Sequence, residues 1–103
     1  MPSPRYQGKP LLRILECYVL WAIGALPEDD ADALKAMTPK LAACYGGEGS
    51  WQEIMAAALE LPPTLPEMIR GSWEKSTERA RAGGATLDPQ AFAEHFVDKN
   101  LVE

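Results

Sequence analysis

The amino-acid sequence predicts an all-α protein, with five or six short helices packed as an irregular bundle or orthogonal array around an apolar first helix. Apolar residues recur at spacings of three and four in most segments, as one face of a helix requires. No segment alternates apolar and polar residues as a half-buried strand would, and valine occurs only three times. Glycine pairs, which commonly end helices, follow two of the helical segments, at Gly46-Gly47 and Gly83-Gly84.

The chain is expected to begin with an irregular lead-in over residues 1–9, followed by a single helical domain over residues 10–103. Pro10 suits the first turn of a helix, because the N–H that proline lacks would have no partner there. Residues 11–26 are apolar on nearly every side of a helix, so this first helix is predicted to be buried. Pro27 is predicted to end it.

Residues 27–45 are predicted to be helical. Leu34, Met37 and Leu41 have the spacing of one apolar helix face. Thr38-Pro39 allows two interpretations: a kink within one helix, or the cap and first residue of a second short helix.

Two capping-box patterns predict where the next two helices begin. Ser50 and Glu53 form the first S-x-x-E pattern, and Thr64 and Glu67 repeat the spacing as T-x-x-E. Residues 61–63, Leu-Pro-Pro, separate the two helices, and a rigid turn is favoured there over a polyproline ligand.

The fourth helix is predicted to be buried only in its first half. Leu65, Ile69 and Trp73 lie on one face at helical spacing. Beyond Trp73 this face becomes weakly apolar and charged residues crowd the surface. The second half is therefore expected to project into solvent.

The last helix has the clearest predicted start. Asp88 is expected to be its N-cap, with Pro89 at the first helical position. Leu87 and Phe92 match the positions of a hydrophobic staple. Phe92 and Phe96 lie four residues apart and therefore on one face.

Cys17 and Cys44 are both predicted to be small buried hydrophobes. A disulfide between them is an alternative that their spacing does not establish. Two cysteines and the single histidine, His95, are too few for a zinc site.

The net charge of −5 comes from fifteen acidic and ten basic residues with no basic stripe, which argues against nucleic acid as a partner. The longest uncharged apolar stretch, residues 17–26, is too short to span a bilayer. A cytoplasmic protein with no membrane partner is expected.

No catalytic or cofactor motif is present in the sequence. His95 has Asp98 three residues later, but no nucleophile or oxyanion site accompanies the pair, so a surface histidine is favoured over a catalytic base. The acids of residues 28–32 lack the spacing of a calcium loop and instead suit the start of a helix. We therefore predict no enzyme activity, no cofactor and no metal.

The predicted function is that of a small acidic module that binds another, basic protein. Its more specific form is an inhibitor, immunity protein or antitoxin that covers a basic protein surface. Two alternatives stay open: a structural homo-oligomer, such as a homodimer paired through the apolar first helix, and a helix-turn-helix regulator whose two short helices come from residues 27–45. The residues predicted to contact the partner are Glu28, Asp29, Asp30, Asp32, Glu48 and Trp51.

Overall fold

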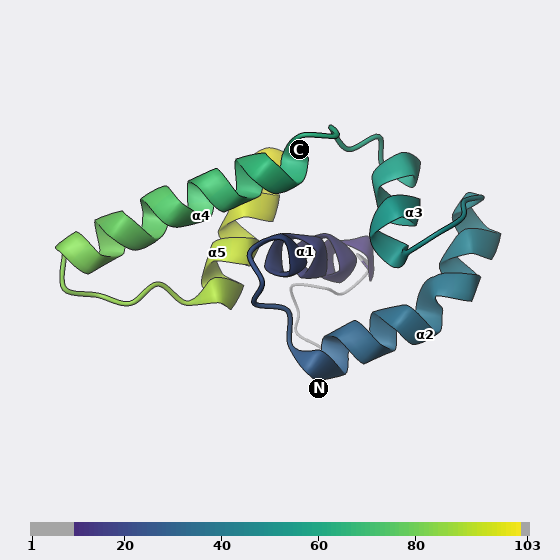
Figure 1. Ribbon diagram of the computed structural model, residues 1–103, viewed down its shortest axis with the longest axis horizontal. Helices are drawn as coiled ribbons and strands as arrows, with labels where there is room; N and C mark the ends of the chain where they lie inside the picture. Colours follow the sequence, from purple (N-terminus) through teal and green to yellow (C-terminus); the bar gives the residue numbers. More distant parts are fainter. Residues whose placement is uncertain (1–9, 102–103) are drawn as a thin grey trace. The chain divides into compact units, whose positions relative to one another are not determined.

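The computed structural model describes residues 10–101, which form five α-helices and one π-helix and contain no strand (Figure 1). The all-α prediction is therefore confirmed, and the number of α-helices in this range matches the lower of the two predicted values. The predicted lead-in, residues 1–9, lies outside the described residues. The elements are α1 (Pro10–Ala22), α2 (Glu28–Tyr45), α3 (Trp51–Ala58), α4 (Leu65–Ala82), α5 (Pro89–Phe96) and the π-helix η2 (Val97–Leu101).

The chain divides into two compact units. The first combines α1 with the C-terminal elements α4, α5 and η2, so that it joins the two ends of the described chain. The second is formed by residues 26–65, which contain α2 and α3.

In the first unit, α1 packs against α5 and η2. This helix is buried on almost every side, as its composition predicts, and Trp21 is its exposed large hydrophobic residue. From α5 and η2, the buried side chains are those of Phe92, Ala93, Phe96 and Val97. The buried residues of α1 are Leu12, Ile14, Leu15, Glu16, Cys17, Tyr18, Val19, Leu20 and Ala22.

The prediction of where α1 ends is wrong by four residues: the helix ends at Ala22 rather than at Leu26. Gly24 has a φ of 72°, in the left-handed region that favours glycine. The following residue, Ala25, then donates its N–H to the carbonyl of Leu20 at 2.9 Å. This glycine-dependent reversal ends the helix before the proline that was expected to do so.

Helix α4 is attached to the first unit through its first half. Ile69 is fully buried, and the ring of Trp73 meets that of Phe92 edge-on at 5.2 Å between centroids. Arg70 Nε donates to the carbonyl oxygen of Ala22 at 2.9 Å, which satisfies an acceptor at the end of α1. No side chain of residues 74–82 is buried, so the predicted exposure of the second half is confirmed.

The start of α5 forms as predicted. Asp88 is the N-cap, its carboxylate accepts the N–H of Ala91 at 2.9 Å, and Pro89 occupies the first position. The rings of Phe92 and Phe96 lie 5.8 Å apart on the same face. The chain then continues into the π-helix η2, an element that the sequence pattern did not predict.

In the second unit, α2 packs against α3. Residues 28–45 form one helix with Pro39 inside it, so the expectation of two short helices over residues 27–45 is wrong. The Thr38 hydroxyl donates to the carbonyl of Leu34 at 2.9 Å. The φ of proline is compatible with a helix, so the helix continues past Pro39 with one backbone hydrogen bond missing.

The two cysteines differ in their surroundings. Cys17 is buried, as predicted, whereas Cys44 is exposed, and both thiols are free. The prediction for Cys44 is wrong because Leu34 and Leu41, seven residues apart, define the buried face of α2. Cys44 follows Leu41 by three residues and falls to one side of that face.

The end of α3 supplies a stability prediction. Glu60 has a φ of 53°, a left-handed conformation that costs a non-glycine residue about 1 kcal/mol or more. Its side chain is exposed, so Glu60→Gly relieves strain without removing a buried group. We expect the substitution to raise the free energy of unfolding by about 0.5 kcal/mol, measured by urea denaturation.

The matched control is Gly84→Ala at the end of α4, where φ is 78° and a Cβ would meet no atom within 4 Å. It should lower the free energy of unfolding by about 1 kcal/mol through backbone strain alone. A stability for Glu60→Gly below that of the wild type would contradict the assigned backbone conformation.

Candidate functional site

The first turns of α2 gather four of the six residues predicted to contact a partner. Glu28, Asp29 and Asp30 lie in the first turn and Asp32 follows; we call these four residues the acidic turn. Asp30 is half-buried and the other three side chains are exposed. The N-cap, Pro27, makes no side-chain capping hydrogen bond, so nearby carboxylates interact favourably with the partial positive charge at this helix end. The helix therefore stabilises the acids where solvent reaches them.

The other two predicted residues, Glu48 and Trp51, are not brought to the acidic turn. They follow the opposite end of α2, and the fifteen residues from Asp30 to Tyr45 span about 22 Å of helix. Glu48 is exposed in the loop before α3. The side chain of Trp51 is only 6% exposed, so its indole is not part of the exposed surface.

Helix α2 also exposes apolar side chains that the sequence pattern placed elsewhere. Met37 was expected on the apolar face with Leu34 and Leu41, but 39% of its surface is exposed. Tyr45, in the last turn, is exposed as well. An apolar surface thus lies on the same helix as the acidic turn, about two turns beyond Asp30 in the case of Met37.

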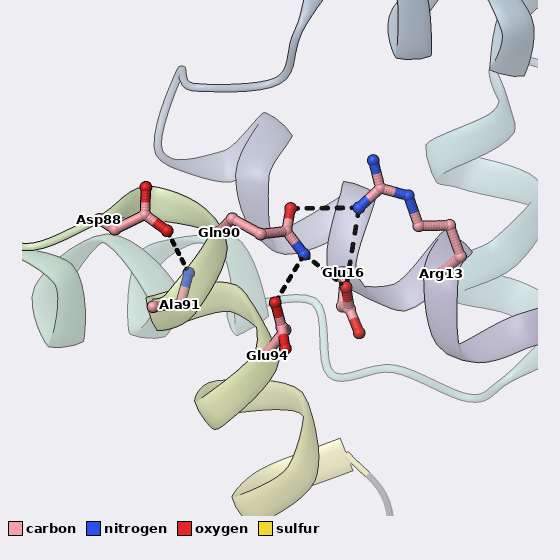
Figure 2. A network of polar contacts seen from close by, with 6 residues as sticks. All are labelled: Arg13, Glu16, Asp88, Gln90, Ala91 and Glu94. Carbon is pink, nitrogen blue, oxygen red and sulfur yellow. Dashed lines mark hydrogen bonds and ion pairs between the residues drawn. The ribbon is translucent and has the colours of Figure 1, made fainter. Parts of the chain in front are cut away.

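A polar network joins α1 to α5 in the first unit (Figure 2). The carboxylate of Glu16 is fully buried and accepts from Gln90 Nε2 at 2.8 Å. The same nitrogen donates to Glu94 Oε2 at 3.1 Å. Arg13 Nη1 donates to Gln90 Oε1 at 3.1 Å and lies 3.7 Å from Glu16 Oε1. One amide side chain therefore connects an arginine with two carboxylates.

This network fits a structural role better than a chemical one. Gln90 fixes the register of α5 on α1, because its amide bonds residues of both helices. Within residues 10–101, no group of three or more histidine, cysteine, aspartate or glutamate side chains could hold a metal ion. The sequence analysis treated Glu16 only as an interruption of an apolar run. A single acid inside such a run, three residues after an arginine, is the signal that could have found the network.

His95 and Asp98 were the one candidate catalytic pair, and both side chains are exposed. His95 belongs to the last turn of α5, whereas Asp98 lies in η2. Among the helices that the structure describes, none is both long enough and apolar enough to cross a membrane.

Tyr18 gives a pH prediction for the first unit. Burial raises the pKa of its phenol above the ordinary value of 10.0, because the interior disfavours the charged form. A pKa that is higher in the folded state means a contribution to stability that is complete below pH 10 and is lost as pH rises through the folded pKa. The free energy of unfolding should therefore fall more steeply between about pH 9 and about pH 11 for the wild type than for Tyr18→Phe. Parallel curves in urea denaturation would contradict the assignment.

Comparison with known proteins gave no matching family model, no similar curated protein and no similar solved structure.

Proposed function

We propose that this chain is a protein-binding module that binds a basic protein surface through the acidic turn of α2. The observation that carries the proposal is the position of four carboxylates within five residues at the start of an 18-residue helix, three of them exposed and one half-buried. A helix holds them in a fixed arrangement, so a partner meets a preformed negative surface. The net charge of −5 has the same sign.

Electrostatic attraction from such a surface acts mainly on the rate of encounter and on the choice of partner. The exposed Met37 supplies an apolar contact beside the charges. An inhibitor, immunity protein or antitoxin that covers a basic active surface would act in this way, and we place this activity in the cytoplasm. Nucleic acid would be repelled by the same carboxylates.

Pairing of two chains through α1 has less support. The apolar side chains of that helix from Leu12 to Leu20 are already buried, and Trp21 is 37% exposed. A helix-turn-helix built on residues 27–45 has less support too, since those residues form a single helix.

The test compares capture of partners by three forms of the tagged chain. The first is the wild type, and the second neutralises the acidic turn with Glu28→Gln, Asp29→Asn and Asp32→Asn. The third, a control with the same change in net charge, carries Glu67→Gln, Glu74→Gln and Glu78→Gln on α4. A basic protein should be recovered from a lysate of the source cells in stoichiometric amount by the wild type and the control.

The neutralised acidic turn should recover at least about tenfold less of that protein. Three surface charge pairs at about 0.5 kcal/mol each amount to roughly one factor of ten. Circular dichroism checks that all three forms have the same helix content. Equal recovery by the wild type and the neutralised form would overturn the proposed function.

A further inference from the structure

Helix α4 carries an exposed surface of the opposite sign to the acidic turn. Met68, Lys75 and Arg79 are seven and then four residues apart, so they lie along one stripe of the helix, which we call the basic stripe. All three side chains are exposed, and Met68 is the most exposed large hydrophobic residue of the described chain, at 56%. The acids of α4 fall on a different side of the helix, at Glu67, Glu74 and Glu78.

Helix α2 carries a matching stripe. Asp30 and Met37 are seven residues apart, and Cys44 follows after seven more, so all three lie on one side of the helix. Met37 and Cys44 are exposed and Asp30 is half-buried. The acidic turn thus leads into an apolar surface, as the basic end of α4 does when that helix is followed backwards.

The two stripes have the same spacing in opposite directions. From Asp30 forward to Met37 is seven residues, and from Lys75 back to Met68 is also seven, about 10 Å of helix in each case. An antiparallel pairing that places Asp30 opposite Lys75 therefore also places Met37 opposite Met68. Arg79, one turn beyond Lys75, then lies beside the start of α2, where Glu28 and Asp29 are exposed.

We propose that the basic surface recognised by the acidic turn is α4 of a second copy of this chain. This inference rests on the proposed function, since it names the partner of the same carboxylates. Each copy has one α2 stripe and one basic stripe, so two copies can pair reciprocally about a twofold axis, with two identical seams. Antiparallel helices also bring the helix ends of opposite partial charge together.

The net charge of −5 on each copy opposes association, but at physiological salt this repulsion is screened over about 8 Å. Ion pairs within a seam are closer than that distance. The pairing therefore depends on the local match between stripes, and substitutions within the stripes are the way to test it.

The experiment is sedimentation equilibrium of the full chain from about 1 µM to about 200 µM at physiological salt, where mass action reveals a weak dimer. The wild type should form a dimer. Asp30→Lys and Lys75→Glu should each weaken dimerisation at least tenfold. The double variant Asp30→Lys/Lys75→Glu exchanges the charges across the seam and should return the dissociation constant to within about threefold of the wild type.

Arg81→Glu is the matched control. It changes the charge of the last turn of α4 as Arg79→Glu does, but Arg81 lies on the opposite side of the helix from the basic stripe. Arg79→Glu should weaken the dimer, whereas Arg81→Glu should leave it within about twofold. Equal effects of the two substitutions would assign the association to overall charge and overturn the seam, and failure of the exchanged pair to restore dimerisation would do the same.

A wild-type chain that stays monomeric up to the highest concentration would also overturn this inference. The proposed function would then be decided separately, by whether the neutralised acidic turn still captures a basic protein other than the chain itself. If the chain is monomeric and that capture is unchanged, both proposals are wrong.

Discussion

Replacing Gln90 with Leu is expected to lower the free energy of unfolding by about 3 kcal/mol, a large part of the total for a domain of this size. The substitution keeps the side-chain volume but removes the donor that lies 2.8 Å from the buried carboxylate of Glu16. A buried charge that loses a hydrogen-bond partner incurs most of its desolvation cost. Arg13 lies 3.7 Å from the same carboxylate and its side chain is 35% exposed, so it compensates only partly.

The double variant Glu16→Leu/Gln90→Leu separates loss of the hydrogen bond from disturbed packing. Replacing both partners with apolar residues removes the buried charge together with its donor, and such exchanges are often close to neutral. We therefore expect the double variant to be more stable than Gln90→Leu alone. Urea denaturation of the wild type, both single variants and the double variant gives the coupling energy. A double variant whose loss equals the sum of the two single losses would show that the network does not stabilise the fold.

The helix starts were predictable because their signals are local. Ser50 accepts the N–H of Glu53 at 3.3 Å, and Asp88 caps α5 with Pro89 behind it. A side chain that bonds a backbone N–H three residues later needs no tertiary contact, so its pattern can be read from the sequence. The end of α1 depends instead on the left-handed conformation of Gly24, a signal that the following proline obscured.

The surface residues were less predictable because exposure depends on which helix packs where. Met37 and Trp51 are both large and apolar, and the sequence gives each of them the spacing of a helix face. The structure exposes Met37 and buries Trp51, since the packing of α2 on α3 selects one side of each helix. The acidic turn could be predicted as an exposed helix start, because its position follows from the helix boundary alone.

The attachment of α4 provides the second large effect. Ile69 has no exposed surface, and Ile69→Ala should lower the free energy of unfolding by about 3 kcal/mol, the sum of the lost transfer free energy and of a cavity. Met68 is its neighbour in the sequence but is 56% exposed, so Met68→Ala should change the free energy of unfolding by about 0.5 kcal/mol or less. The two substitutions remove comparable volumes from adjacent positions of one helix. The difference between them therefore measures the orientation of α4, and equal losses in urea denaturation would mean that a different side of the helix faces the core.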